Sequence, residues 1–304
     1  MKKLKIALDW TPNTNHTGIF VAKELGYFAE NNIDLEISSP ANDDYLQTPA
    51  KKLELDQIDL AIVPTESLLS LHTKENKIDV KAIYAILQED TSAIVTLKSS
   101  TIARPKDLDG KIYASFKARY EDKIVQKMII NDGGSGTIKI EYPEKLGIWD
   151  TILANKSDAS WIFRAWEGIE AQNQEVDLNY FSLNDFGIPY GYTPIIIAKT
   201  ENLQLHYEYF ESFVNATRKG YLFAKNNPEK AVDIVSKYIP KKDLDKIDVL
   251  QSQLFLNPFY GTNDSIGKMD NFVFQNFIDW LFENQIVEKR LESHELFTNE
   301  FFKN

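Results

Sequence analysis

The sequence predicts an α/β fold built from two similar halves. Three observations lead to this expectation. Over the first 75 residues, apolar strand-like runs and amphipathic helix-like segments alternate three times, the pattern of a parallel sheet covered by helices. A second run of alternating elements occupies about residues 98–190. The last third reads as mostly helical, and we expect its helices to return to the first half.

Hydrophobic periodicity and helix-terminal residues define the elements of the first half. Residues 4–8 form a short apolar run typical of a buried strand, and residues 33–37 alternate with the period of two that a half-buried strand requires. A helix over 17–28 is closed by Gly26, since glycine readily adopts the left-handed cap. Pro49 places the start of the next helix, within 45–55, near itself. A strand over 58–63 then turns into a helix over 68–73.

The second half repeats this scheme, and long helices follow it. Strands are expected over 80–87, 93–97, 111–114, 138–140, 159–163, 179–183 and 192–198, with helices up to residue 130 and over 149–154. Helices over 209–226, 228–238 and 272–283 complete the chain, and Phe272, Asn276, Ile278 and Leu281 are predicted to pack in the core. Chain crossings near 90–92 and 189–192 predict a two-strand hinge between one lobe of residues 1–91 and 193–304 and another of 92–192. Small ligands usually bind in such a cleft.

Composition excludes several classes of function. The 304 residues are 43% hydrophobic and 26% charged, as in ordinary globular proteins. The net charge of −11 argues against nucleic acid and against anionic membrane surfaces as partners. Because the chain has no cysteine, disulfides, thiolate metal sites and cysteine nucleophiles are excluded. Four scattered histidines form no visible metal-binding cluster, so no metal or cofactor is expected.

The amino terminus carries no recognisable leader. Only about five apolar-leaning residues follow the two lysines before Asp9, whereas the apolar core of a signal peptide needs about 7–15. No run approaches the ~20 apolar residues of a membrane span. The sequence as given therefore predicts a cytoplasmic protein, or a periplasmic or extracytoplasmic one if a leader was removed.

The loop after the first strand concentrates chemical groups. Within eight residues it holds a carboxylate, an indole, two amides and an imidazole, from Asp9 to His16. A loop between a strand and a helix lies at the carboxyl edge of an α/β sheet, where ligands usually bind. This loop is therefore the first candidate for a binding site.

Several segments resemble one protein family. The motif Leu-Asp-Trp-x-Pro-Asn-x-Asn-His-x-Gly-Ile at 8–19 is the most specific; residues 26–28, 59–62, 66–69, 107–111, 166–168, 190–192 and 297–301 match later segments. The family covers the pyrimidine-binding periplasmic proteins of thiamine salvage and the thiamine-pyrimidine synthases. The resemblance implies the type II periplasmic-binding-protein fold, with a ligand held between two closing lobes. It also implies an aminopyrimidine-class ligand and allows an ABC transporter permease as a partner.

The synthases of this family imply a competing function. They build the pyrimidine from pyridoxal phosphate and one of their own histidines, using a lysine to hold the cofactor. Counted from Asp59, the corresponding positions here are Val63 and Ser67, which offer neither an amine for a Schiff base nor an imidazole. The cysteine-rich iron-binding stretch of the synthases is also missing. These departures favour a binding protein over an enzyme, so no catalytic residue is assigned.

Each candidate ligand-binding residue has a structural alternative. Trp10 could stack on an aromatic ligand or pack in the core. Asn13 could bond ring nitrogens or cap the helix, and capping is preferred for Asn15. His16 could act as a neutral hydrogen-bonding group or as a cap, and Glu66 could face the cleft or only favour the first turn of its helix.

The candidates of the second half lie after strands and in loops. Trp166 and Glu167 could stack on an aminopyrimidine and accept its amine protons, or start a helix beside a packed indole. Arg164 could bind a ligand anion, or pair with Glu167 or Glu170. The aromatic candidates, any of which could instead pack a loop, are Phe116, Tyr120, Tyr190 and Tyr192. The polar residues at the first crossing, Asp90, Thr91 and Ser92, are expected mainly to hold the turn.

Overall fold

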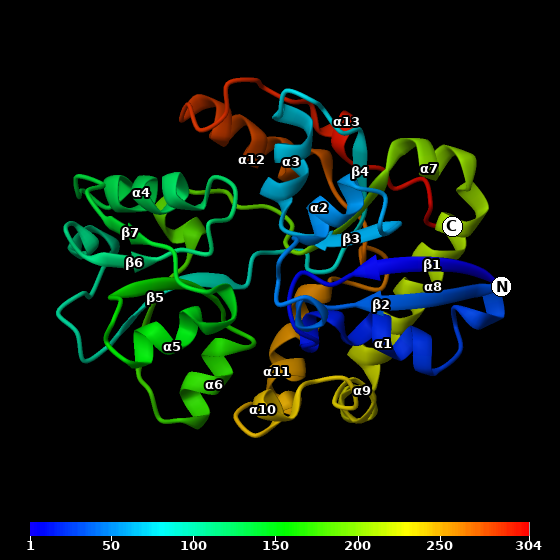
Figure 1. Ribbon diagram of the computed structural model, residues 1–304, viewed down its shortest axis with the longest axis horizontal. Coiled ribbons are helices and arrows are strands. Elements are labelled where there is room, and N and C mark those ends of the chain that lie inside the picture. The colour runs from blue at the N-terminus through cyan, green and yellow to red at the C-terminus, as the bar shows by residue number, and fades with distance from the viewer. Residues whose placement is uncertain (304) are drawn as a thin grey trace.

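Two five-stranded mixed sheets with flanking helices form the molecule, as the computed structural model of residues 1–303 shows (Figure 1). The first sheet has the strand order β2-β1-β3-β10-β4 and the second the order β7-β6-β8-β5-β9. The strands of the first are β1 (Lys2–Ala7), β2 (Ile33–Ser38), β3 (Leu60–Val63), β4 (Val80–Ala85) and β10 (Ile195–Lys199). Those of the second are β5 (Ser92–Leu97), β6 (Ile112–Ala114), β7 (Lys139–Glu141), β8 (Ala159–Phe163) and β9 (Leu178–Phe181). The predicted α/β class is confirmed.

The two sheets share one pattern of strand directions. In the first sheet β1 pairs in parallel with β2 and β3, while β10 pairs antiparallel with β3 and β4. In the second, β6 pairs in parallel with β7 and β8, while β5 pairs antiparallel with β8 and β9. The antiparallel member of each sheet is the strand that follows a crossing of the chain. The parallel pairing expected for the strands of the first 75 residues is confirmed, and each chain crossing adds an antiparallel strand to its sheet.

Helices flank both sheets. Those before β10 are α1 (Thr17–Glu24), α2 (Pro49–Glu54), α3 (Thr65–Thr73), α4 (Glu121–Asn131), α5 (Ile148–Leu153) and α6 (Glu167–Asn173). Those after it are α7 (Thr200–Leu205), α8 (Tyr207–Asn226), α9 (Pro228–Val235), α10 (Lys241–Leu244), α11 (Val249–Leu256), α12 (Asn271–Glu283) and α13 (Ser293–Leu296). In Figure 1 the helices of the last third lie around the first sheet, with α12 and α11 also facing the second. The predicted lobe boundaries stay a prediction; the chain changes sheets between β4 and β5 and between β9 and β10.

Close packing of α1 on α8 fixes the loop after β1. A Cβ atom on Gly220 would lie 2.0 Å from the carbonyl oxygen of Gly18, so the two backbones meet where no side chain fits. The hydroxyl of the adjacent Tyr221 donates a hydrogen bond of 2.6 Å to the carbonyl oxygen of Asn15. This bond ties the single turn η1 (Thr14–His16) to α8, which helps to fix the loop before it.

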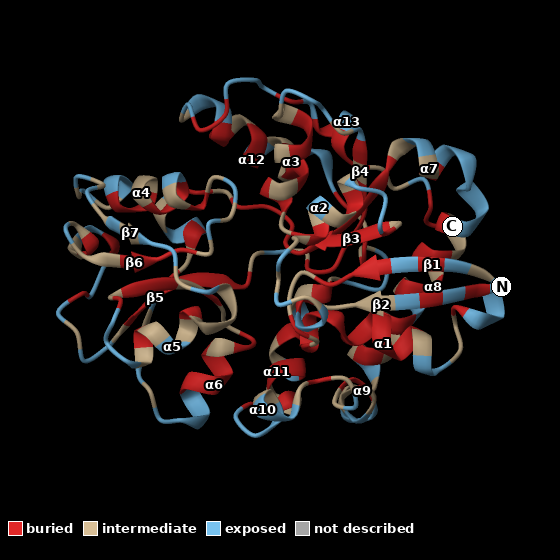
Figure 2. Cartoon of the chain, viewed as in Figure 1, coloured by how far each residue is buried: buried red, intermediate tan, exposed pale blue. Residues whose placement is uncertain are grey.

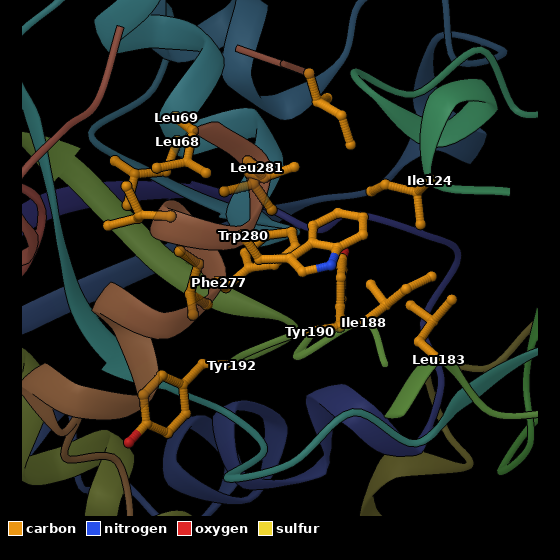
Figure 3. Packing of buried hydrophobic residues seen from close by; sticks show 14 of the residues in the cluster. Leu68, Leu69, Ile124, Leu183, Ile188, Tyr190, Tyr192, Phe277, Trp280 and Leu281 are labelled. Carbon is orange, nitrogen blue, oxygen red and sulfur yellow. The ribbon is translucent and has the colours of Figure 1, made fainter. Parts of the chain in front are cut away.

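One hydrophobic cluster joins the two sheets at the side where α12 lies. Figure 3 shows Trp280 of α12 between Leu68 of α3 and Ile188 of the second crossing. The same cluster contains residues of β3 in the first sheet and of β5, β6 and β8 in the second. Phe272 and Asn276, both predicted to lie in the core, are exposed, because the apolar stripe of α12 runs through Phe274, Phe277, Ile278 and Leu281 instead.

Buried residues concentrate along the strands and on the inner helix faces, and exposed residues lie at the periphery (Figure 2). Among the helices of residues 1–303, none combines the length and apolar character needed to cross a membrane.

Candidate functional site

A cavity of about 140 Å³ lies between the two sheets. It is lined from the first-sheet side by Asp9, Trp10, Tyr45, Pro64, Glu66 and Thr193, and from the second by Ser92, Phe116, Ala118, Glu121, Lys145, Trp161, Phe163, Glu167 and Tyr190. An engineered apolar cavity of roughly 150 Å³ holds one benzene molecule. The space therefore matches a single aromatic ring.

Aromatic side chains from equivalent positions of the two sheets form the walls. Trp10 follows β1 and Phe116 follows β6, and both strands are second in their sheets. Their rings meet edge to face, with centroids 5.7 Å apart. The ring of Tyr45 also packs against Trp10, with the two centroids 5.8 Å apart. Trp161 of β8 donates its indole N–H to the hydroxyl of Ser92 over 2.6 Å, so its orientation is fixed.

The carboxyl of Glu66 is buried at the start of α3. Its side chain accepts a hydrogen bond from the hydroxyl of Tyr190 through Oε2, which leaves Oε1 for a ligand. Burial raises the pKa of Glu66 to about 7, although the bond from Tyr190 opposes the shift. This group therefore carries a proton for part of the time near neutral pH.

Glu167 provides a second carboxyl at the start of α6. Its Oε2 accepts a hydrogen bond of 3.0 Å from the backbone N–H of Phe163, so the side chain folds back over the end of β8. Burial raises the pKa of Glu167 to about 7 as well. Glu167 lines the cavity with one oxygen engaged, so it offers the same hydrogen-bonding capacity as Glu66.

Two further acidic residues, Glu121 and Asp90, stabilise loops next to the cavity. Glu121 accepts from the hydroxyl of Tyr113 at 2.7 Å and from the backbone N–H of Phe116 at 3.1 Å and Ala118 at 2.9 Å. Both of its oxygens are thereby committed to shaping the loop that carries Phe116. Asp90 accepts from the backbone and hydroxyl of Ser92 at 2.9 and 2.6 Å, and burial raises the pKa of Asp90 to about 6.

His16 acts on the cavity only through Asp9. Its Nδ1 accepts the backbone N–H of Asn13 at 3.2 Å, so Nε2 carries the proton and donates to Oδ1 of Asp9 at 2.7 Å. The imidazole is fully buried, whereas Asp9 lines the cavity. Asn13 caps η1 by accepting the N–H of Asn15 at 2.9 Å, so the cap is Asn13 and the preference for Asn15 was wrong.

The cavity lining contains five of the predicted site residues: Trp10, Glu66, Phe116, Glu167 and Tyr190. The other six, Asn13, His16, Tyr120, Arg164, Trp166 and Tyr192, do not line it. Whether any of the eleven binds a ligand stays a prediction.

The predicted second-half residues outside the cavity have structural roles. The guanidinium of Arg164 lies over the rings of Tyr180 and Phe255, so the expected ion pair with Glu167 or Glu170 was wrong. Tyr192 accepts the backbone N–H of Asp270 at 2.8 Å, and Trp166 is buried in the core beside the first sheet.

The remaining one, Tyr120, bonds the hydroxyl of Thr73 at 3.1 Å. This contact links α3 to the start of α4 and leaves Tyr120 outside the cavity.

Sequence reasoning missed several lining residues, chiefly Asp9, Tyr45, Lys145 and Trp161. Asp9 belonged to the opening motif, and Trp161 stood in a predicted strand, but neither signal shows which way a side chain points. Lys145 is the one lysine that lines the cavity among residues 1–303, and it lies 4.5 Å from the ring centre of Tyr45. Burial lowers the pKa of Lys145. The described residues include no group of three or more acids and histidines arranged to hold a metal ion.

Comparisons with known proteins agree with this architecture. The model of the family "NMT1/THI5 like" matches residues 13–231. The formylaminopyrimidine-binding protein of Halalkalibacterium halodurans is 22% identical over 98% of this chain and 90% of its own. The 4-amino-5-hydroxymethyl-2-methylpyrimidine phosphate synthase of Legionella pneumophila is 25% identical over 79% of this chain and 74% of its own.

Solved structures show the fold. A ligand-binding component of an ABC-type import system from Staphylococcus aureus superposes with a TM-score of 0.74 at 14% identity, over 99% of this chain and 98% of its own. The alkanesulfonate-binding protein SsuA of Xanthomonas axonopodis pv. citri gives 0.73 at 11% identity, over 97% and 98%. The predicted periplasmic-binding-protein fold is confirmed. With the family model matching more than two thirds of its length, the chain belongs to the NMT1/THI5-like family.

Proposed function

We propose that this protein binds a single-ring aminopyrimidine of the thiamine-precursor class in the cavity between its two sheets. The proposal rests on one observation: the carboxyl groups of Glu66 and Glu167, each with one oxygen in a hydrogen bond, line the same cavity as several aromatic rings. An aminopyrimidine has a flat apolar face, an amine that donates and ring nitrogens that accept. The aromatic walls can cover the ring while the carboxyls bond its edge.

The raised pKa values of the two carboxyls suit this ligand. A carboxyl with a pKa of about 7 can accept amine protons when ionised and donate to a ring nitrogen when protonated. A sulfonate or nitrate anion would instead be repelled by ionised acids in a buried site. The lining therefore favours a nitrogen heterocycle over the anions that relatives of the same fold bind.

Cavity size limits the ligand further. One relative, from Chloroflexus aurantiacus, is named as riboflavin-binding and is 21% identical. A three-ring flavin is much larger than the single ring that a cavity of about 140 Å³ matches. This favours a pyrimidine over a flavin.

We further propose that the protein delivers its ligand to an ABC-type transporter outside the cytoplasm, rather than making the pyrimidine. Support comes from the fold and from Val63 and Ser67, which stand where the synthases resembled here carry lysine and histidine. The proposal predicts that disrupting the gene abolishes uptake of the labelled pyrimidine. Unchanged uptake would contradict the transport role.

Calorimetric titration tests the binding proposal directly. The panel contains 4-amino-5-hydroxymethyl-2-methylpyrimidine, its formylaminomethyl relative, riboflavin, taurine and pyridoxal phosphate. We expect binding of the pyrimidines alone, weakened at least tenfold, or about 1.4 kcal/mol, by Trp10→Ala and by Glu167→Leu. Phe272→Ala, which truncates an exposed ring on α12, is the control and should bind as the parent does.

Two outcomes would contradict the proposal. Equal affinity of the Trp10 and Glu167 variants and the parent would place the site elsewhere. A Schiff-base absorbance with pyridoxal phosphate that Lys145→Met abolishes would point to an enzyme, because Lys145 is the amine at this cavity.

A further inference from the structure

Acidic groups outnumber basic groups in the cavity between the sheets. Its lining includes one ammonium group, that of Lys145, and four carboxyl groups, those of Asp9, Glu66, Glu121 and Glu167. The ammonium group of Lys145 lies 4.5 Å from the ring centre of Tyr45 and forms no ion pair with the acids of residues 1–303. One lysine therefore faces an excess of acids.

The hydrogen-bond partners of these acids leave the excess in place. His16 donates from Nε2 to Asp9, but its Nδ1 accepts a backbone N–H, so the imidazole is neutral. Glu66 accepts from a tyrosine hydroxyl and Glu167 from a backbone N–H, both of which are neutral donors. None of these contacts supplies the positive charge that would compensate a buried carboxylate.

Protons take the place of the missing cation in the unliganded protein. Burial raises the pKa of Glu66 to about 7, and the charges of Glu121 and Asp90 add to this shift. Burial raises the pKa of Glu167 to about 7 as well. Because an isolated buried carboxylate is costly, a ligand that brings a positive charge would stabilise the ionised form of both groups.

The surroundings of the two carboxyls differ in charge. Beside Glu66 the other titratable groups are Asp9, Tyr45, Asp90, Glu121, Lys145 and Tyr190. Beside Glu167 they are Lys145, Glu170, Lys242, Asp243 and Lys246. Lys246 is paired with Glu170 at 3.0 Å, and the charges of both lysines lower the pKa of Asp243 against its burial. Acids therefore dominate near Glu66, whereas acids and lysines balance near Glu167.

The aromatic walls also favour a cation. The faces of indole and phenol rings attract a positive charge, and this attraction grows when the charge is desolvated. The cavity already contains one such contact, between Lys145 and the ring of Tyr45. Trp10, Phe116 and Trp161 offer further rings to a ligand in the same space.

An aminopyrimidine becomes a suitable cation by taking one proton from the solvent. The proton goes to the ring nitrogen para to the amine, because the lone pair of the amine is delocalised onto that atom. The cation then donates hydrogen bonds from the amine at one end of the ring and from the N–H at the other. Glu66 at the start of α3 and Glu167 at the start of α6 provide one acceptor for each donor.

We infer that the site selects its ligand as a monocation, a single aromatic ring protonated at a nitrogen para to an amine. Glu66 is the counterion of the ring N–H, because its neighbours are mainly acidic, and Glu167 accepts from the amine. The inference rests on the proposed function, since it places the ring in the same cavity.

Three ring analogues separate charge from shape. At pH 8, 4-amino-2-methylpyrimidine is mostly neutral, whereas 4-amino-2-methylpyridine keeps the nitrogen para to the amine and is a cation. 3-Methylaniline has no ring nitrogen and is neutral. By calorimetric titration at pH 8, we expect the pyridine to bind about tenfold more tightly than the pyrimidine or better, and the aniline to bind about tenfold more weakly than the pyrimidine or worse.

The pH dependence should differ between the two bases. Between pH 7 and 8.5 the carboxyls of Glu66 and Glu167 complete their ionisation, so the affinity for the pyridine, which stays protonated, should rise. The pyrimidine loses its proton over the same range, and its affinity should fall. Parallel profiles for the two bases would contradict binding of the cation.

A ¹⁵N label on the ring nitrogen para to the amine shows where the proton lies. The chemical shift of this nitrogen changes strongly on protonation. In 4-amino-5-hydroxymethyl-2-methylpyrimidine bound at pH 8, we expect the shift of the acid form, although the free ligand at that pH shows the shift of the neutral form.

Variants assign the counterion. Glu66→Gln keeps an oxygen that accepts from Tyr190 but carries no charge. It should weaken the pyridine by about tenfold or more at pH 8 and return the bound pyrimidine to the neutral shift. Glu167→Gln should weaken the pyridine less and leave the protonated shift in place. Glu201→Gln, an exposed site on α7, is the control and should bind as the parent does.

The failures are distinguishable. A neutral shift in the bound pyrimidine, or equal affinity for the pyridine and the aniline, would refute the cation and leave the proposed function standing. If Glu66→Gln keeps the protonated shift and the affinity, Glu66 is not the counterion. If the labelled pyrimidine does not bind, the proposed function fails and the inference with it.

Discussion

The two cavity carboxyls should make the unliganded protein less stable as pH rises. Glu66 and Glu167 each have a pKa of about 7 in the folded chain, against an ordinary value of 4.5. Between these values the folded state holds protons that the unfolded state has released. The free energy of unfolding therefore falls as pH rises through this window and levels off above about 7.

The size of the effect follows from the shift. A difference of about 2.5 units, at about 1.4 kcal/mol per unit, gives about 3 kcal/mol for each carboxyl. Total stabilities of domains lie near 5–15 kcal/mol, so the loss is measurable. Asp90, with a pKa of about 6, adds to the decrease in the free energy of unfolding in the acidic part of this pH range.

Denaturant unfolding of Glu66→Gln and Glu167→Gln at pH 5, 6, 7 and 8, without ligand, tests the reasoning. Glutamine keeps an oxygen that accepts from Tyr190 or from the N–H of Phe163, but it does not titrate. Most of the window lies above pH 5, so from pH 5 to 8 each variant should lose about 3 kcal/mol less than the parent. The exposed-site control Glu201→Gln should follow the parent. Parent and cavity variants with parallel pH profiles would refute the proposed protonation of these carboxyls.

Further predictions concern packing and closure. Gly220→Ala should lower the free energy of unfolding by about 1–3 kcal/mol or more, because its Cβ would lie 2.0 Å from the carbonyl oxygen of Gly18. Denaturant unfolding measures this change, and an unchanged denaturation midpoint would contradict the close approach of the two helices. Lys246→Met removes the 3.0 Å ion pair with Glu170, which joins the segment between α10 and α11 to α6. Ligand release measured by stopped flow should then become several-fold faster, and an unchanged rate would show that the pair does not hold the cleft closed.

The order of elements could be predicted from the sequence because it depends on local patterns. The strand at 159–163 is found where expected, and α12 begins one residue before its predicted start. Strand direction at the crossings could not be predicted, because it depends on how two distant segments meet. Pairing of β10 with β3 joins segments more than 130 residues apart.

Part of the candidate site could also be predicted from the sequence. Residues just after strand ends, such as Trp10 and Glu66, line the cavity, because the carboxyl edge of each sheet faces the other. Arg164 also follows a strand directly, yet it stacks on aromatic rings, and Tyr192, three residues before β10, bonds the backbone before α12. Lys145 lies on a short turn, η5 (Lys145–Gly147), which no hydrophobic periodicity in the sequence predicted. Side-chain direction in loops depends on tertiary contacts that a single sequence does not display.

The cluster around Trp280 bears on how the molecule unfolds. Because apolar residues of both sheets share one continuous interior there, neither sheet can melt without exposing part of the other's core (Figure 3). Heat should therefore disrupt both sheets in a single cooperative transition, with equal calorimetric and van't Hoff enthalpies, although the chain passes twice between them. Replacing Trp280 with alanine would weaken this thermodynamic coupling, and a second melting transition could then separate from the first.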